Sequence, residues 1–200
     1  MHQQLVREGQ PSPSQEVLVQ DSAQLGLWLF LATLTMLFAA FISAYLVRST
    51  GPDWQTTPLL GVLWANTVVL IASSITLEVA RSRRKRSILR TFRNWFLVTL
   101  LLGFGFLVGQ LVAWKQLMDL GIFIPSNPHS SFFYILTGLH GLHLFSGLIF
   151  LLYVFLRVKP ALAESCSSGS AHRDLTGLCA TYWHFLTALW LFVFVMLFYW

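Results

Sequence analysis

Three histidines within long apolar stretches are the residues of this chain best suited to chemistry. His140 and His143 lie three positions apart in one stretch, and His184 lies in the last one. Ionisable side chains are costly in a hydrocarbon environment, so such residues are candidates for function. Their spacing places His140 and His143 on one side of a helix, about one turn apart. Imidazole is also a good ligand for zinc, copper and iron.

Three interpretations of these histidines compete. They could bind a metal ion, serve as axial haem ligands, or form hydrogen bonds that join packed helices. A haem in a membrane takes ligands on its two opposite faces, normally from different helices, so one haem could use at most two of the three. Because acidic or cysteine partners at ligand spacing are missing from the sequence around them, hydrogen-bonded packing is favoured.

No other catalytic set is visible in the sequence. It has no phosphate-cradling glycine loop, no nucleophile paired with a base, and no pair of membrane carboxylates that could relay protons. Glu78 precedes Arg81 by three positions, and this spacing predicts an ion pair along one face of a helix. The sequence therefore predicts a protein without an active site of its own.

The positions of the charged residues indicate which elements carry these side chains. Only 10% of the 200 residues are charged and 56% are hydrophobic, which excludes a soluble enzyme and a disordered chain. Two cysteines are too few for a disulfide scaffold. Five stretches between charges are long enough for the roughly 20 apolar residues that a bilayer core requires. We expect an all-α membrane protein with a polar cytoplasmic tail over 1–24 and five transmembrane helices at about 25–47, 58–80, 94–115, 131–157 and 177–200.

Lysines and arginines gather on one side of the expected bundle, and Arg48 and Lys115 lie on the other. Because basic loops stay in the cytoplasm, we expect a cytoplasmic N-terminus and a periplasmic C-terminus. The densest cluster lies between the second and third helices, where nucleic acid is an implausible partner. Topology alone accounts for this cluster, and contact with anionic lipid is the alternative. Its members are Arg81, Arg83, Arg84, Lys85, Arg86 and Arg90.

The last two expected helices carry motifs that resemble those of a known family. One contains TGLHGLH at 137–143, and the next contains YWHF at 182–185. Together with the patterns of the first three helices, they are similar to subunit III of the haem-copper terminal oxidases, in its short bacterial five-helix form. The resemblance covers nearly all of residues 25–200. Family motif positions, for which a helix-packing role is expected, are occupied by Asn66, Gln110, His140, His143, Trp183 and His184.

The resemblance implies a non-redox accessory subunit of a cytochrome c oxidase that reduces O2 to water and pumps protons in a bacterial inner membrane. Haem and copper are expected in partner subunits I and II, and none in this chain. The implied partners are those two subunits and membrane phospholipids, with a respiratory supercomplex as a further association. Subunit III of a quinol oxidase, or a homologue associated with nitric oxide reductase, is the alternative within the family. A stand-alone membrane haem-binding or transport protein is the alternative outside it.

Three positions depart from the family pattern. The family usually has an acidic residue where this chain has Leu34, often a glutamate where it has Ala113, and commonly an aspartate where it has Thr187. Roles in proton traffic or in shaping a lipid cleft that depend on those carboxylates are not carried over to this chain. Uncharged residues also avoid the cost of burying a carboxylate, which favours a structural role.

Overall fold

The computed structural model describes residues 13–54, 61–85, 89–123, 127–158 and 169–199. Within these ranges the chain forms five helices and no strand. The helices are α2 (Pro13–Arg48), α3 (Gly61–Lys85), α4 (Leu89–Asp119), α5 (Pro128–Val158) and α6 (Gly169–Tyr199). Each contains a span long and apolar enough to cross a membrane, which confirms the predicted all-helical architecture. Helices suit lipid because every backbone N–H and C=O group pairs within the segment.

The helix ends follow local chemistry rather than hydropathy. α2 begins at Pro13, inside the segment expected to be a polar tail, and α5 begins at Pro128; proline suits a first helical position because its missing N–H is no loss there. The side chain of Asn127 accepts a hydrogen bond from Ser130 N at 2.8 Å and so caps α5. Gly121 follows α4 with a φ of 76°, a conformation that favours glycine.

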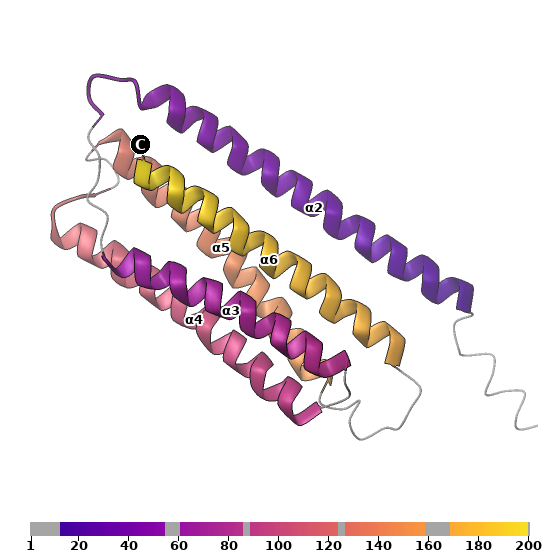
Figure 1. Cartoon of the computed structure of the whole chain (residues 1–200). Helices are drawn as coiled ribbons and strands as arrows, with labels where there is room; N and C mark the ends of the chain where they lie inside the picture. The colour runs from indigo at the N-terminus through magenta and orange to yellow at the C-terminus, as the bar shows by residue number, and fades with distance from the viewer. Residues whose placement is uncertain (1–12, 55–60, 86–88, 124–126, 159–168, 200) are drawn as a thin grey trace, which may run out of the picture.

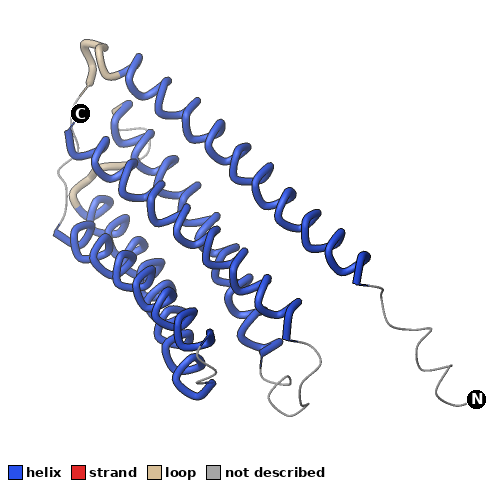
Figure 2. The backbone as a smooth tube through the Cα atoms, turned by 45° about the vertical axis from the view of Figure 1, so that its right-hand side comes forward, coloured by secondary structure: helices blue, strands red, loops and turns tan. Residues whose placement is uncertain are grey.

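Helix α6 is the most buried of the five, and α2 is peripheral. The antiparallel pair α3 and α4 packs side by side, and α5 lies against α4 and α6 (Figure 1). Within the described part of the chain, α2 contacts α5 and α6 alone, and it lies along the outside of the bundle (Figure 2). Buried residues make up 50% of the apolar window of α6 but 17% of that of α2.

Apolar side chains lie both inside and outside the bundle. Inside, the buried rings of Phe106 and Trp190 meet edge-on at 4.9 Å. Outside, many large apolar side chains are exposed, among them Leu101, Phe104 and Phe192. A soluble monomer rarely exposes such a surface, whereas lipid tails are as apolar as the side chains they would cover.

A cluster of aromatic rings, here called the aromatic clasp, fastens the end of α2 to the start of α5. The buried Tyr45 ring lies edge-on to Trp54 at 4.9 Å and to Phe132 at 5.7 Å. Trp54 also meets His129 at 5.1 Å. Edge-on aromatic pairs stabilise beyond the burial of their area, so the clasp holds a helix that otherwise has few neighbours.

An ion pair closes the turn that follows α2. The Arg48 guanidinium donates a hydrogen bond to the Asp53 carboxylate at 2.5 Å, and this bond holds the pKa of Asp53 below its ordinary value. Both side chains are about half exposed, so water and salt screen the pair and its contribution is small. That contribution is present at neutral pH and is lost as the pH falls through the lowered pKa.

Two glycines of α4 allow neighbouring helices to approach it closely. A Cβ atom at Gly103 would lie 2.7 Å from Trp183 Cη2, and a Cβ atom at Gly109 would overlap the side-chain amide of Asn66. At Gly105, between them, the same atom would meet nothing within 4 Å. Small residues at helix contacts commonly serve this purpose in membranes. The contact glycines are therefore Gly103 and Gly109.

We expect Gly103→Ala and Gly109→Ala each to lower the melting temperature and the yield of the folded chain in detergent. The new methyl groups would displace buried side chains, and overpacking of this kind costs about 1–3 kcal/mol. Gly105→Ala is the matched control on the same helix; it should be neutral or stabilising, since alanine favours a helix interior by about 1 kcal/mol. Equal losses at all three positions would contradict the assignment.

Candidate functional site

A ladder of hydrogen bonds, here called the indole ladder, joins α6 to α3 inside the bundle. Trp190 Nε1 donates to Thr67 Oγ1 at 3.0 Å, and Trp183 Nε1 donates to Ser73 Oγ at 3.1 Å. All four side chains are buried. The two indoles are about two helical turns apart, so they project from the same face of α6. The ladder therefore connects segments that are 110 to 123 positions apart in the chain.

The hydroxyl groups of the indole ladder donate their own protons to the backbone of α3. Thr67 Oγ1 donates to Leu63 O at 2.8 Å, and Ser73 Oγ donates to Leu70 O at 2.7 Å. Each hydroxyl oxygen still has lone pairs with which to accept from an indole. A hydroxyl suits these positions because it bonds to its own helix and to a partner helix at once.

His184 connects the same two helices nearer to the basic cluster. Its Nδ1 lies 2.5 Å from Ser74 Oγ, and its Nε2 lies 3.5 Å from Glu78 Oε2. Glu78 Oε2 also lies 3.7 Å from Arg81, which confirms the ion pair predicted from their spacing. The side chains of all three ionisable residues are partly exposed, as suits groups near the end of a membrane span.

His143 bonds to its own helix and faces α2. Its Nδ1 lies 2.7 Å from Leu139 O, and because a carbonyl oxygen only accepts, Nδ1 carries a proton. Its ring lies 6.0 Å from that of Phe38 on α2. The Tyr182 hydroxyl of α6 donates to the carbonyl of His143 at 3.1 Å. This turn of α5 therefore contacts both α2 and α6.

His140 faces different neighbours from His143. It is fully buried, and its ring lies 5.0 Å from that of Trp190 and 5.8 Å from that of Phe106. The two histidines therefore do not converge on one ion or one haem. Across the described ranges, no group of three or more His, Cys, Asp or Glu side chains is close enough to hold a metal ion.

Asn66 and Gln110 lie in the same interior as His140. Asn66 Nδ2 donates a long hydrogen bond of 3.5 Å to Phe106 O, and its side chain fills the space beside Gly109. Gln110 lies one turn beyond Phe106 on α4 and is 3% exposed. Asn66, Gln110 and His140 form a set of buried polar residues, here called the polar layer, contributed by α3, α4 and α5.

The hydroxyl groups that pair the helices do not stand out in the sequence. Besides those of the indole ladder, the Thr76 and Thr99 hydroxyls pair α3 with α4 at 2.9 Å. Thr137 Oγ1 accepts a hydrogen bond from Trp114 Nε1 at 3.1 Å. Serine and threonine barely alter a hydropathy profile, so the apolar spans do not reveal them. Their recurrence at helical spacing along α3 is the signal that could have found them.

All three positions that depart from the family pattern are buried. Leu34 is 3% exposed, Ala113 0% and Thr187 7%. Thr187 Oγ1 donates to Trp183 O on its own helix at 3.0 Å, so the hydroxyl proton already has an acceptor and needs none on a neighbouring helix. A carboxylate at any of these places would require a buried partner to offset its desolvation.

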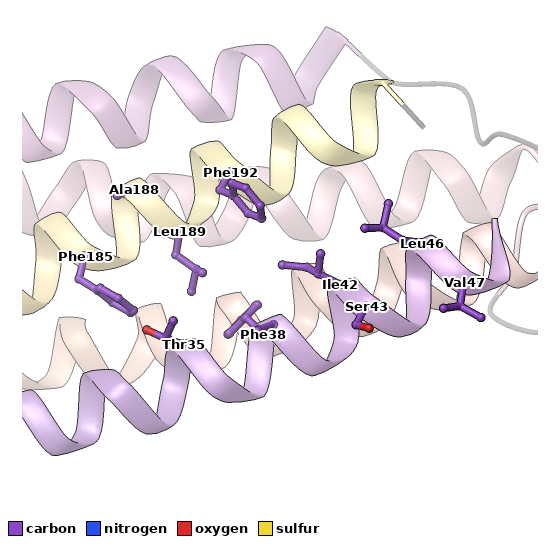
Figure 3. Close-up of a pocket in the computed structure, with 11 residues that line it drawn as sticks. Thr35, Phe38, Ile42, Ser43, Leu46, Val47, Phe185, Ala188, Leu189 and Phe192 are labelled. Carbon is purple, nitrogen blue, oxygen red and sulfur yellow. The ribbon is translucent and has the colours of Figure 1, made fainter. Parts of the chain in front are cut away.

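An apolar groove runs between α2 and α6 (Figure 3). Phe38 and Ile42 of α2 lie on one side of it, and Phe185, Leu189 and Phe192 of α6 lie on the other. Its floor and walls are almost wholly hydrocarbon. The loose packing of α2 described above is the reason that the groove exists.

Of the basic cluster, the structure describes the side chains of Arg81 and Arg83 near the end of α3. That end of α3 lies at the same end of the bundle as the starts of α2 and α6 (Figure 1). The side chains of the remaining four members, Arg84, Lys85, Arg86 and Arg90, lie outside the described residues.

A family model described as "Cytochrome c oxidase subunit III" matches residues 1–200. The chain belongs to the cytochrome c oxidase subunit III family. This confirms the resemblance carried by the TGLHGLH and YWHF motifs. It also sets aside the interpretation of the chain as a stand-alone haem-binding or transport protein.

Several curated members of the subunit III family are similar over almost the whole chain. A probable cytochrome c oxidase subunit 3 of Mycobacterium bovis is 31% identical over 184 residues, which are 90% of this chain and 88% of the relative. Cytochrome c oxidase subunit 3 of Thermostichus vulcanus is 30% identical over 182 residues, covering 89% and 87%. That of Bacillus sp. strain PS3 is 29% identical over 178 residues, covering 87% and 84%. With five helices in its described residues that are long and apolar enough to cross a membrane, this subunit III family member is a multi-pass bacterial membrane protein.

The indole ladder predicts an order of stability for two substitutions. Thr67→Ser keeps the hydroxyl that accepts from Trp190 and removes one methyl group, so a loss of about 0.8 kcal/mol is expected. Thr67→Val keeps the shape of the side chain but leaves the indole N–H buried and unpaired, which costs about 1–3 kcal/mol. Unfolding in mixed micelles measures both, with the same two changes at the exposed Thr33 as control. A loss for Thr67→Val no larger than that for Thr67→Ser would contradict the ladder.

Proposed function

We propose that this chain is a non-redox accessory subunit of a bacterial cytochrome c oxidase, where it stabilises catalytic subunit I and the lipids around it. The main support for the proposal is that the three motif histidines contact neighbouring groups within the bundle. His143 bonds to its own helix backbone. His184 bonds to Ser74, and His140 packs against Trp190. Each is engaged in packing or hydrogen bonding within the bundle, and family membership supplies the complex in which such a bundle would serve.

Redox chemistry in this proposal belongs to partner subunits I and II. Haem and copper there would take electrons from cytochrome c and reduce O2 to water while protons are pumped. This chain would act by binding the folded form of subunit I, which stabilises that form by mass action. The exposed apolar faces of α2 and α4 offer surface for a protein partner, within one oxidase or in a larger supercomplex.

The proposed orientation places the N-terminus in the cytoplasm and the C-terminus in the periplasm. The end of α3, the start of α4 and the start of α6 lie together at one end of the bundle (Figure 1), and basic residues flank these ends in the sequence. Positive charge on short loops favours the cytoplasmic side. The pair formed by Glu78 and His184 would then lie near the cytoplasmic boundary, and the aromatic clasp near the periplasmic one.

Phospholipids are the second class of proposed partner. The groove between α2 and α6 suits acyl chains, because its lining is apolar and it is open along the helices (Figure 3). Anionic headgroups would meet the basic cluster, with each cation near the surface contributing about 1 kcal/mol. The two features belong to different parts of the chain and would hold different lipids.

Purification through an affinity tag on this chain tests the proposed function. We expect a complex with the haem spectrum of an oxidase to be recovered. A dinuclear copper site in the co-purified subunit II would identify cytochrome c as the electron donor, and its absence would favour the quinol oxidase alternative. Recovery of the chain without any haem-containing partner would contradict the proposal.

We expect His143→Leu to lower the amount of assembled complex while the haem content per complex stays unchanged. The substitution removes the bond to Leu139 O and alters the contact with Phe38, so it weakens packing and touches no cofactor. Phe145→Leu, at an exposed position on the same helix, is the control and should assemble normally. Native gels and haem spectra measure the two quantities. Loss of haem at constant subunit stoichiometry would argue against the structural role.

Replacing the whole basic cluster by glutamine is expected to reduce the anionic phospholipid that co-purifies with the chain. The paired change Arg48→Gln and Lys115→Gln, on the opposite side, controls for lost positive charge. Because the cluster also favours the topology, labelling of a cysteine added at each terminus checks the orientation of every variant. An unchanged lipid content at unchanged orientation would show that the cluster serves topology alone.

A further inference from the structure

Gln110 and His140 hold four buried polar atoms that have no hydrogen-bond partner in the part of the chain that the structure describes. The oxygen and nitrogen of the Gln110 amide and both ring nitrogens of His140 are inaccessible and make no hydrogen bond among the described residues. Buried polar groups nearly always have a partner, because leaving one unpaired is costly. In a membrane span, bulk water cannot supply it. The four atoms therefore point to a bound molecule.

The two side chains lie at the same depth on facing helices. Helices α4 and α5 run antiparallel, and Trp114 bonds to Thr137 across them. Gln110 is one turn before Trp114, and His140 is about one turn after Thr137, so the two are at one level. Phe106, one turn from Gln110 on the same face of α4, has its ring 5.8 Å from that of His140. Gln110 and His140 therefore border one small region of the core.

The polar side chains next to this region already form hydrogen bonds with other partners. Asn66 donates to the backbone carbonyl of Phe106 and lies against Gly109. Trp190, whose ring lies 5.0 Å from that of His140, gives its only N–H to Thr67. These side chains enclose the region on the α3 and α6 sides without supplying the missing bonds.

The chemistry of the four atoms selects the class of bound molecule. A neutral imidazole and an amide each offer both a donor and an acceptor, so the molecule must accept and donate as well. The ion pairs of the described residues lie near the helix ends, around Arg48 and Glu78, which leaves an ion at this depth without a counter-charge. One imidazole and one amide oxygen are fewer ligands than zinc or calcium takes. An apolar molecule would leave the polar atoms unpaired.

We propose that Gln110 and His140 form an internal hydration site, in which bound water bridges α4 and α5. A buried water makes about three hydrogen bonds to otherwise unpaired groups, which matches the donors and acceptors at hand. The bound water joins α4 to α5, as the indole ladder joins α3 to α6. The site lies within this chain, so it does not rest on the proposed oxidase function.

A density map that resolves ordered water tests the proposal, from crystals of the full chain grown in lipid or from the complex that co-purifies with it. We expect density for a non-protein atom about 2.7–3.2 Å from a side-chain atom of Gln110 and from a ring nitrogen of His140. The density should vanish in Gln110→Met and in His140→Phe, which keep most of the volume. It should persist in the matched control Thr137→Val. A direct Gln110–His140 bond with no density between, or density that persists in both variants, would overturn the site.

Thermal melting of the full chain in detergent gives a second readout, which does not need a map of each variant. Either single substitution leaves the other polar side chain without the bridging water. The melting temperature of the double variant Gln110→Met/His140→Phe should therefore fall by less than the sum of the two single decreases. Gln110→Met combined with Thr137→Val is the control pair, and its shifts should add. Additive shifts in both pairs would also overturn the proposal.

Discussion

The bundle depends on one constraint: in a bilayer, apolar side chains gain little by leaving lipid for another helix. Specific contacts must then come from close approach and from hydrogen bonds between helices. Helix α6 provides most of these bonds, since its indoles reach Thr67 and Ser73 and its imidazole reaches Ser74. The hydrogen bonds from α6 to α3 are therefore a main source of specific contact within the bundle.

Close approach and loose packing divide the fold into two parts. Gly103 and Gly109 let the side chains of Trp183 and Asn66 pack directly on the backbone of α4, so α3 to α6 form a tight unit. Helix α2 contacts this unit through α5 and α6 alone, within the described residues, and is fastened by the aromatic clasp at one end. The apolar groove follows from this arrangement. The groove lies between α2 and the tight unit, and it is the place proposed for lipid chains.

The spans, the family and the pairing of Glu78 with Arg81 could be predicted from the sequence, because each depends on local composition or spacing. The start of α2 at Pro13 could not, since hydropathy reports only the part of a helix that lies in lipid. The different neighbours of His140 and His143 could not be predicted either. A step of three positions on a helix turns a side chain far enough to meet a different neighbour. The partners of Trp183 and Trp190 depend on how α3 is rotated about its axis. That rotation is set by packing and is not a property of any single segment.

The hydroxyl bonds of α3 have a consequence for how the protein is made. Helix α6 leaves the ribosome well after α3, so α3 must wait in the membrane before its partners on α6 arrive. Thr67 and Ser73 already give their protons to the backbone of α3, so these two hydroxyls expose no unbonded donor to lipid while α3 waits. The indoles of α6 have no such internal acceptor and become satisfied on docking. In the nascent chain the bundle therefore stays open until α6 arrives and docks against α3.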